Sequence, residues 1–225
     1  MIKAVIFDYG GTLVRANVNY DVAFEKSVER LLIEGIEVRK TDFHNAFMDT
    51  VEWRRSVNST GREVDGHEFF SHLLSIFGHE VDRDITDEFG LHIYESAEPK
   101  LLGDIEKLLV TLSKEYKIAL LSNAWLEAPR QHLRDIGYGR WFDVMVTSFD
   151  VAIAKPDQRI FQHTLNLLGV EAHEAVMVGD SIEADMEGAI NAGLEAVWVD
   201  FEGTGEWKGN KVSRLLELPE MIKTL

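Results

Sequence analysis

Five short apolar runs, separated by stretches of helical character, constrain the fold of this chain more than any other feature. Each run is rich in Val, Ile and Ala and does not alternate with polar residues, which is typical of strands buried on both faces. The stretches between them carry apolar residues at helical spacing. Strands that alternate with helices predict an α/β fold, a parallel sheet with helices on both faces. The runs are Val5–Phe7, Ile118–Ser122, Asp143–Ser148, Ala175–Gly179 and Glu195–Val199.

The segment from about residue 19 to residue 97 breaks this alternation, because it shows only helical patterns. Thr41 and Asp65 are candidate N-caps within it. We therefore expect a bundle of about four helices inserted after the first strand. The predicted division assigns residues 14–97 to this helical cap, and residues 1–13 with 98–225 to the core. Asp200–Asn210 is rich in Gly and polar residues and predicts a surface loop.

Charge and composition exclude several classes of function. The 225 residues carry a net charge of −16 and contain no cysteine. Nucleic acid and anionic membranes repel such a chain, so we expect neither as a partner. The chain has no long apolar run and no signal-peptide pattern, which predicts a cytoplasmic protein. A small anionic substrate remains compatible, because a metal ion and one lysine reverse the local charge. The oligomeric state is left open.

Polar residues follow the predicted strands at their carboxyl ends, the edge at which parallel sheets bind ligands. Each type of side chain has a physical role there. Carboxylates at two strand ends can share Mg²⁺, which prefers oxygen ligands. Hydroxyl and amide groups can donate hydrogen bonds to phosphoryl oxygens, and a lysine can neutralise their charge. Glycines let the backbone approach a ligand closely. The residues concerned are Asp8, Gly10, Gly11, Thr12, Ser122, Asn123, Lys155, Asp180 and Asp185.

Two of the carboxylates invite specific roles. Asp8, kept ionised by the cation, can attack phosphorus and form an aspartyl-phosphate. Asp185 stands one helical turn after Asp180 and can orient Lys155 or a metal-bound water. Pro156 is expected to keep Lys155 extended, and Asp157 to cap the following helix.

Four segments together resemble the haloacid dehalogenase-like hydrolase superfamily. They read FDYGGTL, LSNA, AKPD and VGDSIEADMEGAINAG, and they occur in the order of that family's signatures. The resemblance implies a Rossmann-like core with a helical cap, Mg²⁺, and hydrolysis of a small phosphorylated metabolite. It implies three sets of site residues. The catalytic set is Asp8, Lys155 and Asp185; the substrate-binding set is Gly11, Thr12, Ser122, Asn123 and Lys155; the metal ligands are Asp8, the Gly10 carbonyl and Asp180.

One position departs from the family pattern. Phosphatases of this family carry a second aspartate two residues after the nucleophile, which protonates the leaving group and then activates water. This chain has Gly10 there. General acid–base assistance contributes ~10²–10⁴-fold to rates. The sequence therefore predicts slow turnover of poor leaving groups and a long-lived phosphoenzyme.

Gly10 keeps three alternatives open. Dehalogenases of the family also lack the second aspartate, so 2-haloacid dehalogenation is the first of them; Gly179 and Asp180 favour the metal-dependent phosphatase instead. Phosphonate-cleaving relatives use a cap lysine as a Schiff base, and this region offers only Lys26 and Lys40. A non-enzymatic phosphate sensor or binding protein is the alternative from another class.

Some residues of the predicted site also have plain structural interpretations. Asp8 with its glycines can end a strand in a turn, and Ser122-Asn123 can form a turn or a helix cap. Trp53 and the two arginines after it either read a substrate or form a half-buried helix face. Trp125 closely follows the LSNA segment and is a candidate for the lining of the pocket, with an ordinary structural role as the alternative. His67 and His72 are five residues apart and do not share a helix face, which argues against zinc.

Overall fold

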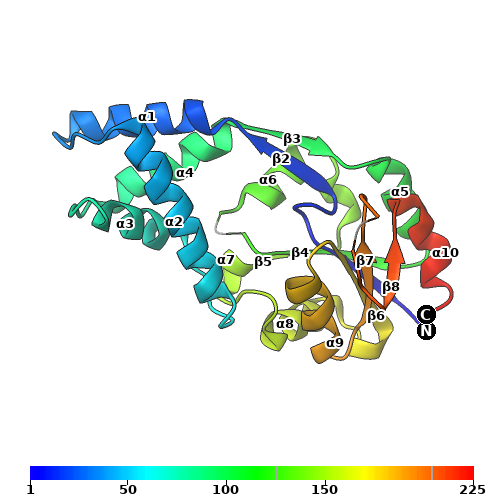
Figure 1. Cartoon of the computed structure of the whole chain (residues 1–225). Coiled ribbons are helices and arrows are strands. Elements are labelled where there is room, and N and C mark those ends of the chain that lie inside the picture. Colours follow the sequence, from blue (N-terminus) through cyan, green and yellow to red (C-terminus); the bar gives the residue numbers. More distant parts are fainter. Residues whose placement is uncertain (125, 204) are drawn as a thin grey trace.

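A six-stranded parallel sheet forms the centre of the larger part of the molecule (Figure 1). The structure is a computed structural model that describes residues 1–124, 126–203 and 205–225, and only the backbone of Ala16. The strands follow the order β5-β4-β1-β6-β7-β8. Their bounds are Ala4–Phe7 (β1), Lys117–Ser122 (β4), Val144–Thr147 (β5), Ala175–Gly179 (β6), Glu195–Val199 (β7) and Asn210–Val212 (β8).

The strand order determines where a ligand can bind. From β1 the chain goes on to β4 and β5 on one side, and then returns to β6, β7 and β8 on the other. β1 is hydrogen-bonded to β4 and β6, so the carboxyl ends of these strands lie side by side. This reversal is the topological switch point at which α/β proteins bind ligands.

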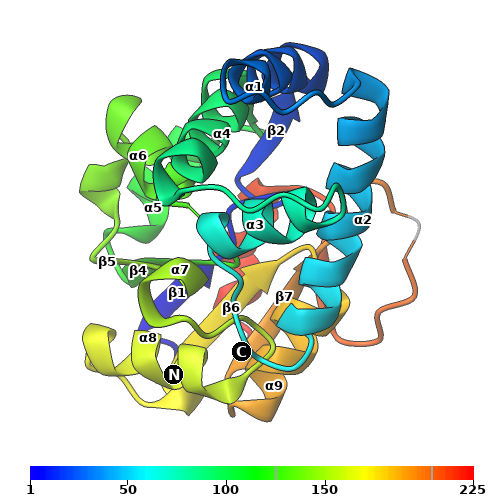
Figure 2. The same cartoon turned by 90° about the vertical axis from the view of Figure 1, so that its left-hand side faces the viewer.

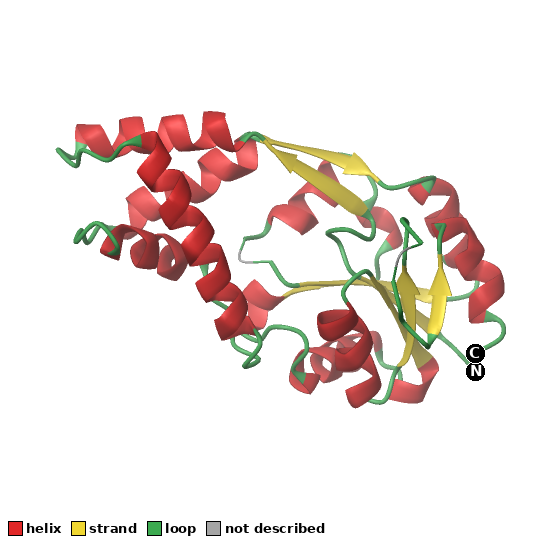
Figure 3. Cartoon of the chain, viewed as in Figure 1, coloured by secondary structure: helices red, strands yellow, loops and turns green. Residues whose placement is uncertain are grey.

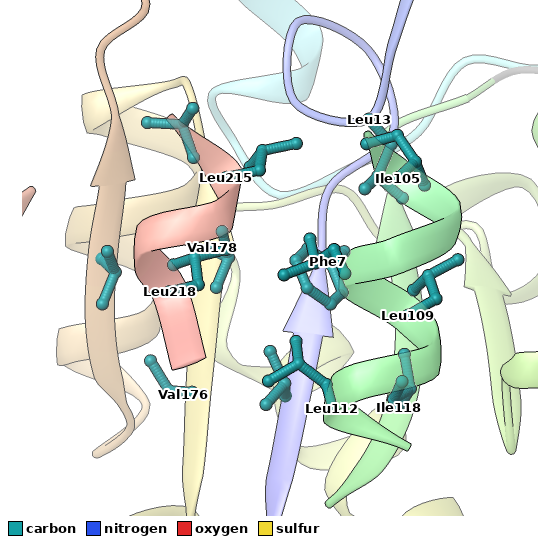
Figure 4. Packing of buried hydrophobic residues seen from close by; sticks show 14 of the residues in the cluster. Phe7, Leu13, Ile105, Leu109, Leu112, Ile118, Val176, Val178, Leu215 and Leu218 are labelled. Carbon is teal, nitrogen blue, oxygen red and sulfur yellow. The ribbon is translucent and has the colours of Figure 1, made fainter. Parts of the chain in front are cut away.

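Helices cover both faces of the sheet, because successive side chains of each buried strand point to opposite faces. Val5 and Phe7 pack into one apolar cluster, with α5 (Ile105–Leu112), α6 (Ala128–Asp135) and α10 (Leu218–Ile222) (Figure 4). Ala4 and Ile6 pack into another, with α8 (Gln158–Leu168) and α9 (Gly188–Asn191). Full burial of a side chain such as that of Phe7 contributes roughly 1.5–3 kcal/mol.

The chain from residue 19 to residue 96 forms a second, helical region at the opposite end of the molecule from the two termini (Figure 1). An antiparallel ribbon of β2 (Val14–Val18) and β3 (Ala97–Leu101) leads into it and out of it (Figure 3). Its core is rich in phenylalanine, including Phe24, Phe43, Phe47 and Phe89. The helices are α1 (Tyr20–Ile33), α2 (Lys40–Asn58), α3 (Gly66–Ser75) and α4 (Arg83–Glu95), and α2 and α3 lie in front of the sheet in Figure 2.

Short elements complete the connections. α7 (Ser148–Val151) follows β5, and a π-helix, η3 (Ile182–Glu187), follows β6 and leads into α9. The remaining turns are 3₁₀ helices at Gly139–Trp141, Ala172–Glu174 and Leu215–Glu217. None of the described helices is both long enough and apolar enough to cross a membrane.

The predicted α/β sheet with helices on both faces is confirmed, and so is the helical insertion. Asp65 is the N-cap of α3, as predicted, and its side chain accepts a hydrogen bond from the Glu68 N–H. The prediction of an N-cap at Thr41 is wrong, because α2 begins at Lys40 and its N-cap position is Arg39. The sequence did not predict β8 or the ribbon. The division of the chain at residues 14 and 97 stays a prediction.

Candidate active site

A buried lysine joins two aspartates at the carboxyl end of β1. The Lys155 ammonium donates to Asp8 Oδ1 at 2.7 Å, to Asp185 Oδ1 at 2.5 Å and to the Leu121 carbonyl at 2.9 Å. The side chains of Lys155 and Asp185 are 2% and 1% exposed. An ammonium has three N–H donors, so each donor of Lys155 has an acceptor. The arrangement holds the Asp8 carboxylate in one orientation at the end of its strand.

Asp180 extends this cluster toward solvent. Single oxygens of Asp8, Asp180 and Asp185 all lie within 4.8 Å of one another, and Asp180 is the exposed member. The Thr12 hydroxyl donates to Asp180 Oδ1 at 3.4 Å, and the Trp198 indole donates to the Asp180 carbonyl at 2.7 Å. The predicted convergence of Asp8 and Asp180 is therefore observed, although their roles as ligands stay predictions.

Two glycines make room for these carboxylates. Gly11 has a φ of +77°, and a Cβ atom on it would collide with the Asp180 carboxylate. A Cβ atom on Gly179 would collide with the carboxylate of Asp185. Asp185 lies in the π-helix, and its Oδ2 also accepts a hydrogen bond from the Ser181 N–H at 3.0 Å. Side chains at positions 11 and 179 would push the acidic groups apart.

The charges of the cluster are not balanced, because three carboxylates face one ammonium. Burial raises the pKa of Asp8 to about 7, against the opposing effect of Lys155, and Asp185 raises it further. Burial alone would lower the pKa of Lys155, but Asp185 and Asp8 together raise it. The ammonium stays charged, and the surplus of negative charge is suited to a divalent cation.

The end of β4 and the loop before α8 are tied together. The Asn123 side chain exchanges two hydrogen bonds of 2.8 Å with the backbone of Lys155. Asn123 therefore fixes the position of Lys155 in this structure, and its predicted contact with phosphate stays a prediction. Ser122 is buried at the end of β4. Asp157 caps α8, as predicted, and the Lys155–Pro156 peptide is cis.

Gly10 differs from Gly11. A Cβ atom built on Gly10 has no atom of another described residue within 4 Å, apart from its chain neighbours. Gly10 is exposed, and its φ lies outside the left-handed region. The site therefore has room at the position where phosphatases of the family carry their second aspartate.

Sequence reasoning missed two polar contacts near the site. The Tyr9 hydroxyl hydrogen-bonds His132 Nδ1 of α6 at 2.8 Å, next to the predicted nucleophile. Glu63, in the loop between α2 and α3, accepts a hydrogen bond from Ser148 at the start of α7. Both contacts join residues far apart in the chain, so no local sequence pattern predicts them.

The remaining candidates of the helical region have partners of their own. Trp53 stacks on His72 at 3.9 Å between ring centroids, and His67 hydrogen-bonds Thr86. Lys26 and Lys40 form exposed ion pairs with Glu95 and Asp21, which argues against a desolvated Schiff-base amine. The prediction that Trp125 lines the pocket falls outside the described residues.

Comparisons with known proteins identify the family of this chain and several relatives. Residues 2–193 match the haloacid dehalogenase-like hydrolase family. Human N-acylneuraminate-9-phosphatase is 34% identical over 56% of this chain and 53% of its own, so the chain spans about half the length of this relative. Glyceraldehyde 3-phosphate phosphatase of Methanothermobacter thermautotrophicus is 28% identical over 91% and 88%.

Among solved structures, 2-haloacid dehalogenase from Pseudomonas syringae shares the fold. Its TM-score is 0.74 at 22% identity, and the match covers 100% of this chain and 99% of the other. With the match to the family over most of its length and the four signatures gathered at one end of the sheet, this chain belongs to the haloacid dehalogenase-like hydrolases.

Proposed function

We propose that this protein is a phosphatase that hydrolyses small phosphorylated metabolites through an aspartyl-phosphate on Asp8. The observation that carries the proposal is the grouping of Asp8, Asp180 and Asp185 around Lys155 at the switch point of the sheet. The phosphatase names of the relatives support it. A cytoplasmic site of action fits a chain without cysteine.

The residues of the chain divide the reaction between them. Asp8 is the nucleophile, and Lys155 holds its carboxylate by a 2.7 Å hydrogen bond while it neutralises charge on the transferring phosphoryl group. Asp185 and the Leu121 carbonyl hold Lys155 in turn. Ser122 at the end of β4 and the backbone N–H of Thr12 bind the phosphoryl oxygens, whereas the Gly11 N–H donates to the Val14 carbonyl at 2.9 Å and Gly11 contributes only by its close approach.

The donor set suits Mg²⁺. Asp8 and Asp180 supply carboxylate oxygens that lie within 4.8 Å of each other, and the Gly10 carbonyl is the third predicted ligand. The fit is supported by the surplus of negative charge in the cluster and by Gly11, whose missing side chain lets Asp180 approach. When bound, a divalent cation neutralises phosphoryl charge and keeps the adjacent carboxylates ionised.

We further propose that the helical region, residues 14–97, acts as a cap. Helices α2 and α3 of this region lie in front of the sheet in Figure 2, and the loop between them bonds residues 152–154, just before Lys155. A cap that excludes water strengthens the electrostatic contacts of the site and protects the phosphoenzyme until water is admitted. Substrate identity is set by side chains of this region.

The test is phosphate release from an aryl phosphate with Mg²⁺, measured on the wild-type chain and on Asp8→Asn. We expect release by the wild type and none above background by the variant, which lacks the nucleophile but keeps its shape. Equal release by both proteins refutes the nucleophilic role of Asp8.

A second candidate is hydrolysis of a carbon–halogen bond in a 2-haloacid. Gly10 favours it, because halide leaves as a stable anion and needs no proton donor at this position. The exposed carboxylate of Asp180 beside Asp8 favours phosphoryl chemistry instead. Chloride release without metal from a 2-chloroacid would support the dehalogenase, and its absence would leave the phosphatase.

A further inference from the structure

The loop between α2 and α3 pairs with the core immediately before Lys155. Arg62 and Ile153 form an antiparallel bridge. The Glu63 N–H donates to the Ala152 carbonyl at 3.2 Å, and the Ala154 N–H donates to the Gly61 carbonyl at 3.1 Å. This contact lies away from the β2–β3 ribbon, where α2 reaches down to α7 (Figure 1). The helical region is therefore attached to the core at the ribbon and at this loop.

The side chain of Glu63 is the buried centre of this contact. It is only 1% exposed, and Oε1 accepts hydrogen bonds from Arg54 Nε at 3.0 Å and Nη2 at 2.7 Å. The Val64 N–H donates to the same oxygen at 2.8 Å. Arg54 compensates the charge of Glu63 and fixes the orientation of its carboxylate, so that Oε2 points at the core.

The second oxygen of Glu63 determines which way the Ser148 hydroxyl points. Ser148 is fully buried, and its hydroxyl donates to Glu63 Oε2. A carboxylate only accepts, so the single proton of the hydroxyl is used there. The lone pairs of Ser148 are then free to accept from the Ala124 N–H, which lies at 2.9 Å. Ala124 directly follows Ser122 and Asn123.

We propose that Glu63 is a positioning residue of the active site. It couples docking of the α2–α3 loop on the core to the correct placement of two loops of the site, residues 122–124 and residues 152–155. Glu63 acts on residues 122–124 through Ser148, and the backbone of its segment acts on residues 152–155. Asn123 joins the two loops through its two hydrogen bonds to Lys155. The catalytic role of these loops rests on the proposed function, whereas the coupling itself does not.

The coupling has a mechanical consequence. If the α2–α3 loop leaves the core, Ser148 loses the acceptor that orients it, and the hydroxyl can rotate to the Ala124 carbonyl at 3.3 Å. That rotation turns the lone pairs of Ser148 and weakens the hydrogen bond from the Ala124 N–H, which loosens the loop that carries Ser122. The site is thus complete only while the helical region is docked.

The test is a double-mutant cycle of Glu63→Gln and Ser148→Ala, with Arg62→Gln as the matched control. The Arg62 side chain lies in the same loop as Glu63 and makes an exposed ion pair with Glu68 of α3, so the control leaves the buried contact intact. Hydrogen exchange of the amides at 122–124 and 152–155 is the first readout. The kcat and KM of the full-length chain on an aryl phosphate are the second.

We expect each single variant to speed exchange at both loops by about tenfold, the factor for one lost hydrogen bond, and to lower kcat by a similar factor with little change in KM. The double variant should show no larger effect on exchange or kcat than either single variant, because all three variants break the same series of hydrogen bonds from Glu63 through Ser148 to Ala124. Additive effects, unchanged exchange at residues 122–124, or an equal effect of Arg62→Gln would overturn the proposal.

Two further outcomes are separable. If Glu63→Gln does not fold, exchange in Ser148→Ala decides alone, with accelerated exchange at residues 122–124 supporting the coupling and unchanged exchange refuting it. If the wild-type chain hydrolyses no phosphate ester, the proposed phosphatase function fails. The exchange measurement then still decides whether Glu63 positions the loops.

Discussion

The substitution Gly10→Asp should convert a slow phosphatase into a faster one. Position 10 is exposed, its φ is not left-handed, and an added Cβ meets no neighbour within 4 Å. A carboxyl group there can protonate the leaving oxygen and then activate water. We expect a gain of ~10²–10⁴-fold in kcat for a phosphate ester with an alkyl leaving group. That gain corresponds to about 3–5 kcal/mol of barrier height.

The gain should depend on the leaving group, because an aryl oxide departs without a proton. The assay therefore compares an alkyl phosphate with an aryl phosphate on the wild type, Gly10→Asp and Gly10→Asn. The asparagine variant has nearly the same size and cannot transfer protons. Replacing glycine at an allowed φ by itself raises stability by about 0.4–1 kcal/mol, and Gly10→Asn separates this backbone effect from the negative charge that Gly10→Asp adds beside the acidic cluster. A folded Gly10→Asp that binds Mg²⁺ yet hydrolyses alkyl phosphates no faster than Gly10→Asn refutes the reasoning.

Three more outcomes follow from the same geometry. Gly11→Ala should weaken Mg²⁺ binding, measured by calorimetry, because its methyl group collides with Asp180 while φ is +77°; unchanged affinity would contradict this. Lys155→Ala should lower the free energy of unfolding by about 3–5 kcal/mol, since it leaves two buried carboxylates without their cation. Chemical denaturation checks this value, and Lys26→Ala, at an exposed pair, is the control that should change little.

The third of these concerns pH. Burial raises the pKa of Asp8 to about 7, so the metal-free native state holds a proton that the unfolded chain has lost above about pH 4. Its free energy of unfolding should fall as pH rises from about 4 to about 7. Mg²⁺ takes the place of that proton, so the rise in Tm on adding Mg²⁺ should be larger at pH 8 than at pH 5. An equal rise at both pH values would contradict this assignment.

The positions of these polar groups were predictable because they depend on strand ends. Asp8 and Asp180 each follow a run of residues that the sheet buries on both faces, Ser122 ends such a run, and parallel strands bring these ends to one edge. The helical stripe from Ile105 to Leu112 was equally clear, since apolar residues three and four positions apart within one short segment form one face of a helix.

The parts that escaped prediction depend on distant pairing. The strands Val14–Val18 and Ala97–Leu101 read VRANV and AEPKL, which alternate apolar and polar residues over only five positions each, and Pro99 argues against a strand, so neither segment is a clear strand on its own. Their ribbon exists because the two ends of the helical region must meet. The contact between Glu63 and Ser148 joins positions 85 apart, and a buried glutamate has no local signature.

The two adjacent glycines show the same limit at the scale of single residues. Gly10 and Gly11 are indistinguishable in sequence pattern, and both were expected to admit the ligand. Only the structure separates them, because Gly11 faces Asp180 with a left-handed backbone while Gly10 faces open space.

The most direct test of the account is intact-protein mass spectrometry on the chain quenched with acid during turnover of an aryl phosphate. Because Gly10 cannot activate water, dephosphorylation should be slow and the phosphoenzyme should accumulate. The account predicts a phosphoryl adduct that maps to Asp8 and is absent from Asp8→Asn. Turnover without any adduct, or an adduct on another residue, would contradict it.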